Sequence, residues 1–223
     1  MIHIKHLNKI YNENMPNAFH ALKDINMDIK QGELLIIKGV SGSGKSTLLS
    51  IIATLIKPSN GELMVKNEHV ARLPDLHTSK FRNVHLGFIP QAFNLFEQFS
   101  VEQNVQIPLV PLKLSLKQSD DKIKKALKLA NIEHKRDQEV NTLSGGEKQR
   151  CAIARALVND PEIILCDEPT ANLDKENSLK FIQIIQNLQK LGKTIIIATH
   201  DSLFDELDSK HTLMKMDDGM IIA

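Results

Sequence analysis

The chain has 223 residues, a formal net charge of +1 and a hydrophobic content of 42%. This length suits one α/β domain with a substantial core, and we expect residues 1–223 to form that single domain. No stretch approaches the ~20 consecutive apolar residues of a membrane-spanning helix, so the chain is not expected to form a path through lipid itself. The nearly balanced charge argues against a broad nucleic-acid-binding face, and no nucleic-acid partner is expected.

The first 35 or so residues alternate apolar and polar side chains, beginning with Ile2 and Ile4. This alternation predicts antiparallel strands that flank the core. The first five residues are too polar for a secretory signal, so we expect cytoplasmic residence. The two cysteines, Cys151 and Cys166, fit that compartment as small reduced residues packed in the core.

A glycine-rich loop follows the apolar residues 34–37, which we interpret as a buried strand. Residues 39–47 fit the phosphate-loop pattern G-x-x-x-x-G-K-[ST], and residues 48–55 continue as an apolar helix. Backbone N–H groups of such a loop point at a β-phosphate, helped by the helix dipole. Lys45 would bridge the β- and γ-phosphates, and the Ser46 hydroxyl would ligate Mg²⁺. The expected nucleotide contacts are Gly39, Ser41, Gly42, Ser43, Gly44, Lys45, Ser46 and Thr47.

Gln91 directly follows the apolar residues 88–90. A glutamine can offer its carbonyl to Mg²⁺ and its amide to water, so Gln91 is a candidate catalytic residue and metal ligand. Residues from about 92 to 155 are predicted to form a helical lobe. Within it, residues 119–121 are expected to cap a basic amphipathic helix. The predicted apolar face of that helix consists of Ile123, Leu127 and Ala130.

A second glycine-rich turn lies roughly a hundred residues after the first, where residues 143–150 read L-S-G-G-E-K-Q-R. It leads directly into a predicted helix, so its backbone is also suited to hold a phosphate. Two half-sites of this kind in one chain suggest that the full site is assembled from two copies. The candidate ligand-binding residues of this turn are Ser144, Gly145, Gly146 and Glu147.

Two further apolar runs end in polar side chains and predict buried parallel strands. Residues 163–166 are followed by Asp167 and Glu168, and residues 194–199 are followed by His200. Ligands of open α/β sheets bind at the carboxyl ends of the strands. Asp167 would orient Mg²⁺, and Glu168 would act as general base toward an attacking water. His200 would contact the γ-phosphate or that water.

The order and spacing of these motifs resemble the nucleotide-binding subunit of an ATP-binding-cassette (ABC) transporter over essentially the whole chain. The resemblance implies a head-to-tail homodimer that encloses two ATP molecules, with Mg²⁺ as cofactor and the adenine stacked on Tyr11. It also implies that the second glycine-rich turn serves the ATP of the neighbouring subunit. The matching positions are Tyr11, residues 39–47, Gln91, residues 143–147, residues 163–168, Leu173, Asp174 and His200.

Within that family, the chain is most similar to the lipoprotein-releasing and macrolide-export group, which includes a cell-division ATPase. Three passages carry the similarity, at residues 12–20, 87–109 and 169–174. Ala171 replaces the group's usual glycine, and residues 53–56 also depart from its pattern. The resemblance implies an ATPase motor that drives a separate membrane permease with an envelope or hydrophobic cargo, peripheral to the inner face of the cell membrane.

The apolar residues after Gln91 have two interpretations: part of the helical lobe's core, or a groove that receives a permease. We expect Phe93, Leu95 and Phe96 to lie nearest the permease. Two alternatives remain for the function, namely a non-transport ATPase of the iron–sulfur assembly type and a regulator of cell-wall hydrolases through a permease-like partner. A DNA-repair type is disfavoured, because only about 95 residues separate the phosphate loop from Leu143.

Overall fold

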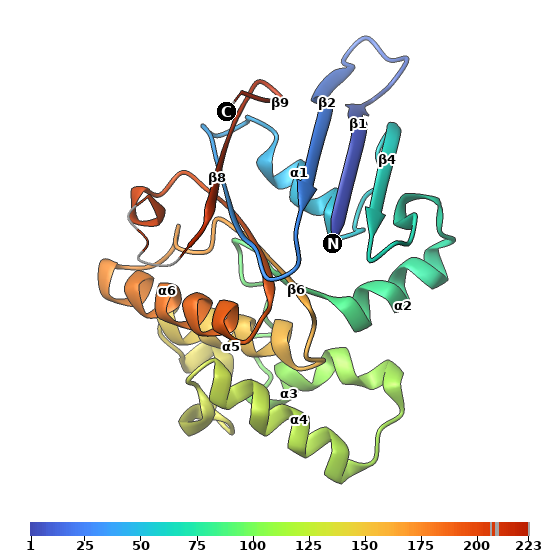
Figure 1. Cartoon of the computed structure of the whole chain (residues 1–223). Helices are drawn as coiled ribbons and strands as arrows, with labels where there is room; N and C mark the ends of the chain where they lie inside the picture. The colour runs from blue at the N-terminus through green and yellow to red at the C-terminus, as the bar shows by residue number, and fades with distance from the viewer. Residues whose placement is uncertain (206, 208–209, 223) are drawn as a thin grey trace.

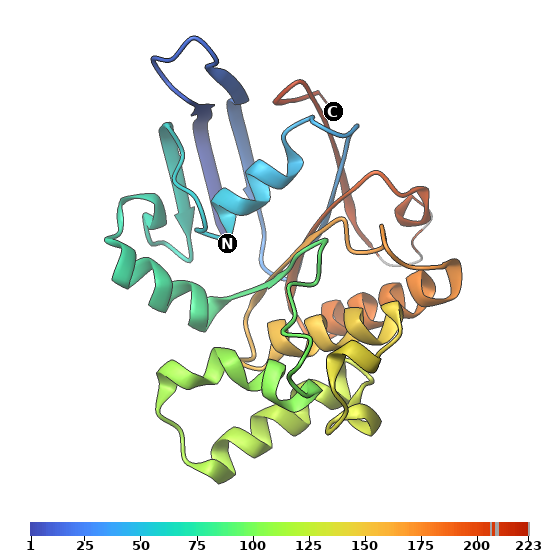
Figure 2. The same cartoon turned by 180° about the vertical axis from the view of Figure 1, so that it is seen from behind.

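The computed structural model describes residues 1–205, 207 and 210–222, in two sheets and a helical region (Figure 1). The helical region lies on the far side of the molecule from the N-terminal sheet, as both views show (Figure 2). The strands are β1 (Ile2–Tyr11), β2 (Phe19–Ile29), β3 (Leu34–Lys38), β4 (Asn60–Val65), β5 (Leu86–Ile89), β6 (Ile163–Asp167), β7 (Thr194–Thr199), β8 (Thr212–Asp217) and β9 (Met220–Ile221). The α-helices are α1 (Lys45–Ile52), α2 (Asp75–His85), α3 (Val101–Gln106), α4 (Leu116–Leu129), α5 (Gly145–Leu157) and α6 (Lys175–Lys190). Short 3₁₀ turns are η1 (Val70–Arg72), η2 (Ile107–Leu112), η3 (Glu133–Lys135), η4 (Val140–Thr142) and η5 (Ser202–Phe204).

The N-terminal strands form a three-stranded antiparallel sheet with the order β2-β1-β4. Its alternating side chains explain this sheet, because Ile2, Ile4 and Leu7 of β1 are buried while residues between them reach the surface. The prediction of antiparallel strands in the first 35 residues is therefore confirmed.

The second sheet has six strands in the order β5-β6-β7-β3-β8-β9, and only β9 runs antiparallel to its neighbour. All six residues of β7 are buried, as expected for a central parallel strand covered on both faces. The parallel arrangement brings the carboxyl ends of β3, β6 and β7 to one edge of the sheet. The predicted α/β fold, with its phosphate-loop core and antiparallel subdomain, is confirmed.

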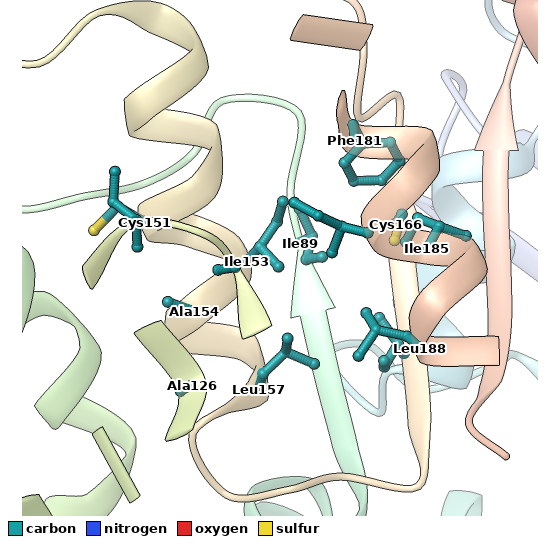
Figure 3. Packing of buried hydrophobic residues seen from close by; sticks show 14 of the residues in the cluster. Ile89, Ala126, Cys151, Ile153, Ala154, Leu157, Cys166, Phe181, Ile185 and Leu188 are labelled. Carbon is teal, nitrogen blue, oxygen red and sulfur yellow. The ribbon is translucent and has the colours of Figure 1, made fainter. Parts of the chain in front are cut away.

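The core beside the parallel sheet joins α5 and α6 to β5 and β6 (Figure 3). Both cysteines are buried there and unpaired, as the sequence predicts. Burial raises the pKa of the Cys151 thiol to about 12, which keeps it protonated and unreactive at neutral pH. Side chains that fill this core include Ile89, Ile153, Leu157, Cys166, Phe181, Ile185 and Leu188.

The start of α4 differs from the prediction. Residues 119–121 do not cap this helix; Ser115 is its N-cap, with its side chain accepting from the Gln118 N–H and the Gln118 side chain accepting from the Ser115 N–H. The S-x-x-Q pattern at 115–118 forms this reciprocal capping box, and Ser119 lies a turn further on, inside the helix. The predicted apolar face of Ile123, Leu127 and Ala130 is buried, as expected.

The helix α1 ends at Ile52, three residues before the predicted boundary. Thr54 has a left-handed backbone with φ of 58°, and the Leu55 N–H bonds back to the Ser50 carbonyl, which closes the helix. Among the described residues, no helix is both long and apolar enough to cross a membrane.

Candidate functional site

The phosphate loop connects β3 to α1, with Gly44 as the N-cap of the helix. Gly44 has φ of 99°, and a Cβ added there would lie 2.7 Å from the Ala21 carbonyl oxygen. A Cβ added at Gly39 would lie 2.3 Å from the carbonyl oxygen of Met216. The two glycines are therefore required by the close approach of β2 and β8 to the loop.

Lys45 is 5% exposed and lies inside this loop. Its Nζ donates to the carbonyl oxygens of Gly39 at 2.8 Å and Val40 at 3.0 Å. The same nitrogen lies 3.7 Å from Glu168 Oε1. Its ammonium group is thus held by weak carbonyl partners within reach of the site where phosphate oxygens would compete for it.

Ser46 and Asp167 join the start of α1 to the carboxyl end of β6. The Ser46 hydroxyl donates to Asp167 Oδ1 at 2.8 Å. Burial raises the pKa of the Asp167 carboxyl above its ordinary value. A divalent cation beside this carboxylate would offset that cost of burial, so the pair has the chemistry of a cation site.

Glu168 and His200 follow β6 and β7 and contact each other directly. Glu168 Oε1 lies 3.0 Å from His200 Nδ1, and Glu168 Oε2 accepts from the His200 backbone N–H at 3.3 Å. Glu168 has a left-handed backbone with φ of 43°, and its N–H donates to the Ala198 carbonyl at 2.8 Å. The Glu168 side chain is 12% exposed and that of His200 is 67% exposed, so the pair reaches from the interior into solvent.

These groups line one cavity of about 290 Å³ over the phosphate loop. The structure therefore brings most of the predicted site residues together. Asp167 and Gly39 do not line the cavity but bond to residues that do. Asp167 accepts from the Ser46 hydroxyl, and the Gly39 carbonyl accepts from the Lys45 ammonium. Ser43 belongs to the loop and is buried. The lining residues are Phe19, Ala21, Ser41, Gly42, Gly44, Lys45, Ser46, Thr47, Gln91, Glu168 and His200.

The predicted residues of the second glycine-rich turn do not line this cavity. Ser144 caps α5, since its side chain accepts from the Glu147 N–H while the Glu147 carboxylate accepts from the Ser144 N–H at 2.8 Å. That bond lowers the pKa of Glu147. A Cβ added at Gly146 would lie 2.2 Å from Asn177 Oδ1, whereas a Cβ at the exposed Gly145 would meet nothing closer than 3.5 Å.

Asp174 lies at the start of α6 and also outside the cavity. Its carboxylate accepts from the Asn177 N–H and side-chain amide, which lowers the pKa of Asp174. Asn177 in turn accepts from Arg150 of α5 at 3.3 Å. Asp174 thus connects the loop after β6 to the helix that begins with Ser144.

Sequence reasoning missed Phe19, which lines the cavity and is 57% exposed. Phe19 is the strand partner of Tyr11, at the open end of the β1–β2 pair. Tyr11 does not itself line the cavity; its ring lies 5.1 Å from Lys9 Nζ. The sequence offered one signal for this role of Phe19. It is an aromatic residue at the start of a strand, directly after the loop at residues 12–18.

The fold and the site define a class of protein: a phosphate-loop ATPase with an antiparallel subdomain and a helical lobe, whose second glycine-rich turn lies outside its own phosphate cavity. The family model described as "ABC transporter" matches residues 22–171, and the chain belongs to the ABC transporter family.

Relatives and solved structures agree with this family. Over 223 residues the chain is 41% identical to the lipoprotein-releasing system ATP-binding protein LolD of Pseudoalteromonas translucida, covering 99% of this chain and 94% of that protein. It is 39% identical to the macrolide export ATP-binding/permease protein MacB of Campylobacter jejuni, over 90% of this chain and 31% of that protein. The dimeric cassette MJ0796 of Methanocaldococcus jannaschii matches with a TM-score of 0.91 and 37% identity, over 100% of this chain and 97% of that one. A post-hydrolysis MJ0796 dimer bound to ADP and Pi matches with a TM-score of 0.90 and 36% identity, over 100% of this chain and 97% of that one.

The chain is therefore an ATP-binding and ATP-hydrolysing subunit of the ABC transporter type. The matched relatives are transport ATPases, so the non-transport alternatives are not favoured.

Proposed function

We propose that two copies of this chain enclose two ATP molecules between them, head to tail. Each ATP would contact Lys45 and Ser46 of one copy and the turn Ser144, Gly145 and Gly146 of the other. The observation that carries this proposal is Gly145: it is exposed and lies outside the phosphate cavity, and no contact with residues 1–205, 207 or 210–222 requires a glycine there. The solved MJ0796 cassettes are dimers, which supports the arrangement.

The roles of the cavity residues follow from their geometry. Lys45 exchanges its loop carbonyls for the β- and γ-phosphates, whose charged oxygens are stronger partners. Glu168 accepts a proton from the attacking water as general base, and His200, 3.0 Å from it, orients that water. The adenine stacks on the aromatic end of the β1–β2 pair, on Tyr11 with Phe19 beside it.

The oxygen donors of the cavity fit Mg²⁺. Ser46 and Asp167 already share a hydrogen bond, and Gln91 lines the same cavity. Hydroxyl, carboxylate and amide oxygens are the ligands that Mg²⁺ prefers. Among the described residues, no group of three or more His, Cys, Asp or Glu side chains is arranged to hold a metal ion. When bound, Mg²⁺ neutralises charge on the β- and γ-phosphate oxygens.

The permease would dock on the face beside the helical lobe. A groove of about 710 Å³ runs between α2 and η2, and its lining includes the exposed Leu76 and Val84. The three predicted docking residues, Phe93, Leu95 and Phe96, are not among its lining residues. Phe96 is 54% exposed and stacks on Phe99 with 5.2 Å between ring centroids. Leu95 packs against the core, so of the three predicted docking residues Phe96 offers the largest apolar contact. Phe93 lies in the loop after Gln91, two residues before Leu95.

The proposed cargo class is a lipoprotein or another hydrophobic envelope molecule, because the chain is similar along almost its full length to a lipoprotein-releasing ATPase. The subunit would sit on the inner face of the cell membrane through its permease.

The test of the composite site uses Glu168→Gln, which keeps the shape of the side chain and removes its basicity. We expect turnover to fall by ~10²–10⁴-fold and ATP to trap a dimer in size-exclusion chromatography. The control is the double variant Lys45→Ala/Glu168→Gln, which should remain monomeric with ATP. Near-normal turnover of Glu168→Gln would remove Glu168 as the base, and a monomer with ATP would refute the enclosed dimer.

The docking proposal is tested with Leu76→Glu, which places a charge in the groove. It should abolish co-purification with the proposed permease while leaving the ATPase rate of the isolated subunit unchanged. The matched control is Leu191→Glu, an exposed leucine outside the groove. Equal permease recovery with both variants would exclude the groove.

A further inference from the structure

The backbone after Gln91 takes an unfavourable path. Phe93 and Asn94 are consecutive left-handed residues, with φ of 54° and 50°. A side chain makes this conformation costly, more for Phe than for Asn, whose short polar side chain can bond locally. Two such residues in succession persist only when surrounding contacts hold them.

Arg155, in the last turn of α5, supplies those contacts. Its Nη2 donates to the Phe93 carbonyl oxygen and its Nη1 to the Asn94 carbonyl oxygen, each at 2.5 Å. The planar guanidinium group presents its donors as a rigid fork, which matches two adjacent carbonyls better than an ammonium group would. Arg155 forms no ion pair with residues 1–205, 207 or 210–222. Its hydrogen-bond partners are the two carbonyl oxygens.

The two ends of the loop are held by other elements. The Asn172 side chain donates to the Gln91 carbonyl at 3.0 Å. The buried Asn104 accepts from the Phe96 N–H at 2.8 Å and donates to the Phe96 carbonyl at 3.0 Å. Neither asparagine hydrogen-bonds to the left-handed pair. The amides of Phe93 and Asn94 bond back within the loop, and among the described residues Arg155 is the side chain that ties this pair to another element.

We propose that Arg155 is a positioning residue: by binding the Phe93 and Asn94 carbonyls it holds Gln91 in the phosphate cavity and couples it to α5. The inference rests on the role proposed above for Gln91. The helix has 13 residues, ~20 Å in length, and moves as one body. Its first turn carries Ser144, which serves the neighbour's ATP, and its last turn carries Arg155, which serves this subunit's own site. Displacement of α5 at one ATP therefore reaches Gln91 at the other.

The first measurement is hydrogen exchange in a peptide that covers residues 91–96 of the full chain. Amides of Phe93, Asn94 and Phe96 are hydrogen-bonded there, so they report on the path of the loop. Arg155→Gln should raise their exchange rates by ~10-fold or more, and Arg155→Lys, which keeps the charge but loses the fork, by less.

The matched control is Arg136→Gln. Arg136 is a partly buried arginine of the same lobe, bound to Glu102 and Asp120, and touches none of residues 91–96. This variant should lower thermal stability and leave exchange of the loop unchanged. The same rise in both variants, or no rise in Arg155→Gln, would overturn the proposal.

Steady-state kinetics supplies the second readout. Arg155→Gln should lower kcat by ~10-fold or more, because Gln91 is displaced from the reacting groups. The KM for ATP should stay within about twofold, because the phosphate loop is untouched. A rise in KM with unchanged kcat would contradict a positioning role. If Gln91→Ala retained normal turnover, the role assigned to Gln91 would be wrong. The exchange rates alone would then test whether Arg155 holds the loop after Gln91.

Discussion

Gly145 and Gly146 are adjacent, but the chain needs a glycine at only one of them. A side chain at Gly146 would collide with Asn177, which Asp174 and Arg150 hold in place. At Gly145 there is ordinary van der Waals space within the chain. A requirement for glycine at 145 must therefore come from a group outside the subunit, and a closely bound phosphate is such a group.

The two alanine variants separate these reasons. Gly145→Ala should leave the melting temperature unchanged or slightly raised, because alanine is ~1 kcal/mol better than glycine in a helix, and should lower turnover at least ~10-fold. Gly146→Ala should instead lower the melting temperature. Calorimetry and a phosphate-release assay measure both effects. A fully active Gly145→Ala enzyme would contradict a phosphate contact at α5.

Most cavity residues could be predicted from the sequence, because a phosphate loop and the ends of parallel strands have fixed geometry. The Ser46–Asp167 bond and the Glu168–His200 contact follow from that geometry. The aromatic side chain of Phe19 was a signal, but its position at the cavity depends on the register between β1 and β2, which has three shifts. Such shifts depend on local packing and leave no regular pattern in the sequence.

At the scale of secondary-structure elements, the error at α4 has a clear cause. Two serines, Ser115 and Ser119, lie four residues apart in this part of the sequence, and either is a suitable N-cap residue. The structure uses Ser115 because Gln118 stands three residues later and completes the reciprocal pair. The period of the hydrophobic residues predicts whether a segment is a helix or a strand. The exact start of α4 depends instead on the side-chain hydrogen bonds between Ser115 and Gln118.

The assignment of the cap predicts different costs for the two serines. Ser115→Ala should destabilise the protein by ~1 kcal/mol, which lowers the melting temperature by about 2–4 °C. Ser119→Ala should cost less, because Ser119 lies inside the helix, where alanine is the better helix former. Thermal melts of both variants decide the matter, and a larger loss for Ser119→Ala would restore the predicted cap at residue 119.

Asp160 ties α4 to the segment after α6 through two lysines. Lys125 and Lys193 donate to its carboxylate at 2.7 and 2.6 Å and lower its pKa to about 2. A carboxyl with a depressed pKa stabilises the fold above its unfolded value of 3.8 and loses that contribution as pH falls toward about 2. The side chain is 47% exposed, so solvent screening limits the gain.

We therefore expect Asp160→Asn to cost no more than ~1 kcal/mol at neutral pH. The difference in free energy of unfolding between the two proteins should shrink as pH falls below 3.8. Urea titrations at several pH values measure this difference. A difference that grows on acidification would show that the lysine contacts are not its source.

At the scale of the whole molecule, the proposed site is divided between two distant parts of the fold. The cavity lies at the carboxyl ends of the parallel strands, and Ser144 lies at the start of α5, outside that cavity. Within one subunit, hydrogen bonds connect the two parts. Asn177 bonds to both Asp174 and Arg150, and Arg155 bonds α5 to the loop after Gln91. In the proposed site, chemistry across the two parts would require a second copy, and a C₂ dimer would supply two equivalent sites.

The most direct measurement of this claim mixes Ser144→Arg subunits with Lys45→Ala subunits. Each homodimer has two damaged sites and should be inactive. Each mixed dimer has one intact site, made of Lys45 from the first chain and Ser144 from the second, and one doubly damaged site. Equal mixing should restore about one quarter of the wild-type ATPase rate, since half of the dimers are mixed and half of their sites are intact. No recovery, with mixed dimers verified by native mass spectrometry, would contradict a site shared between two subunits.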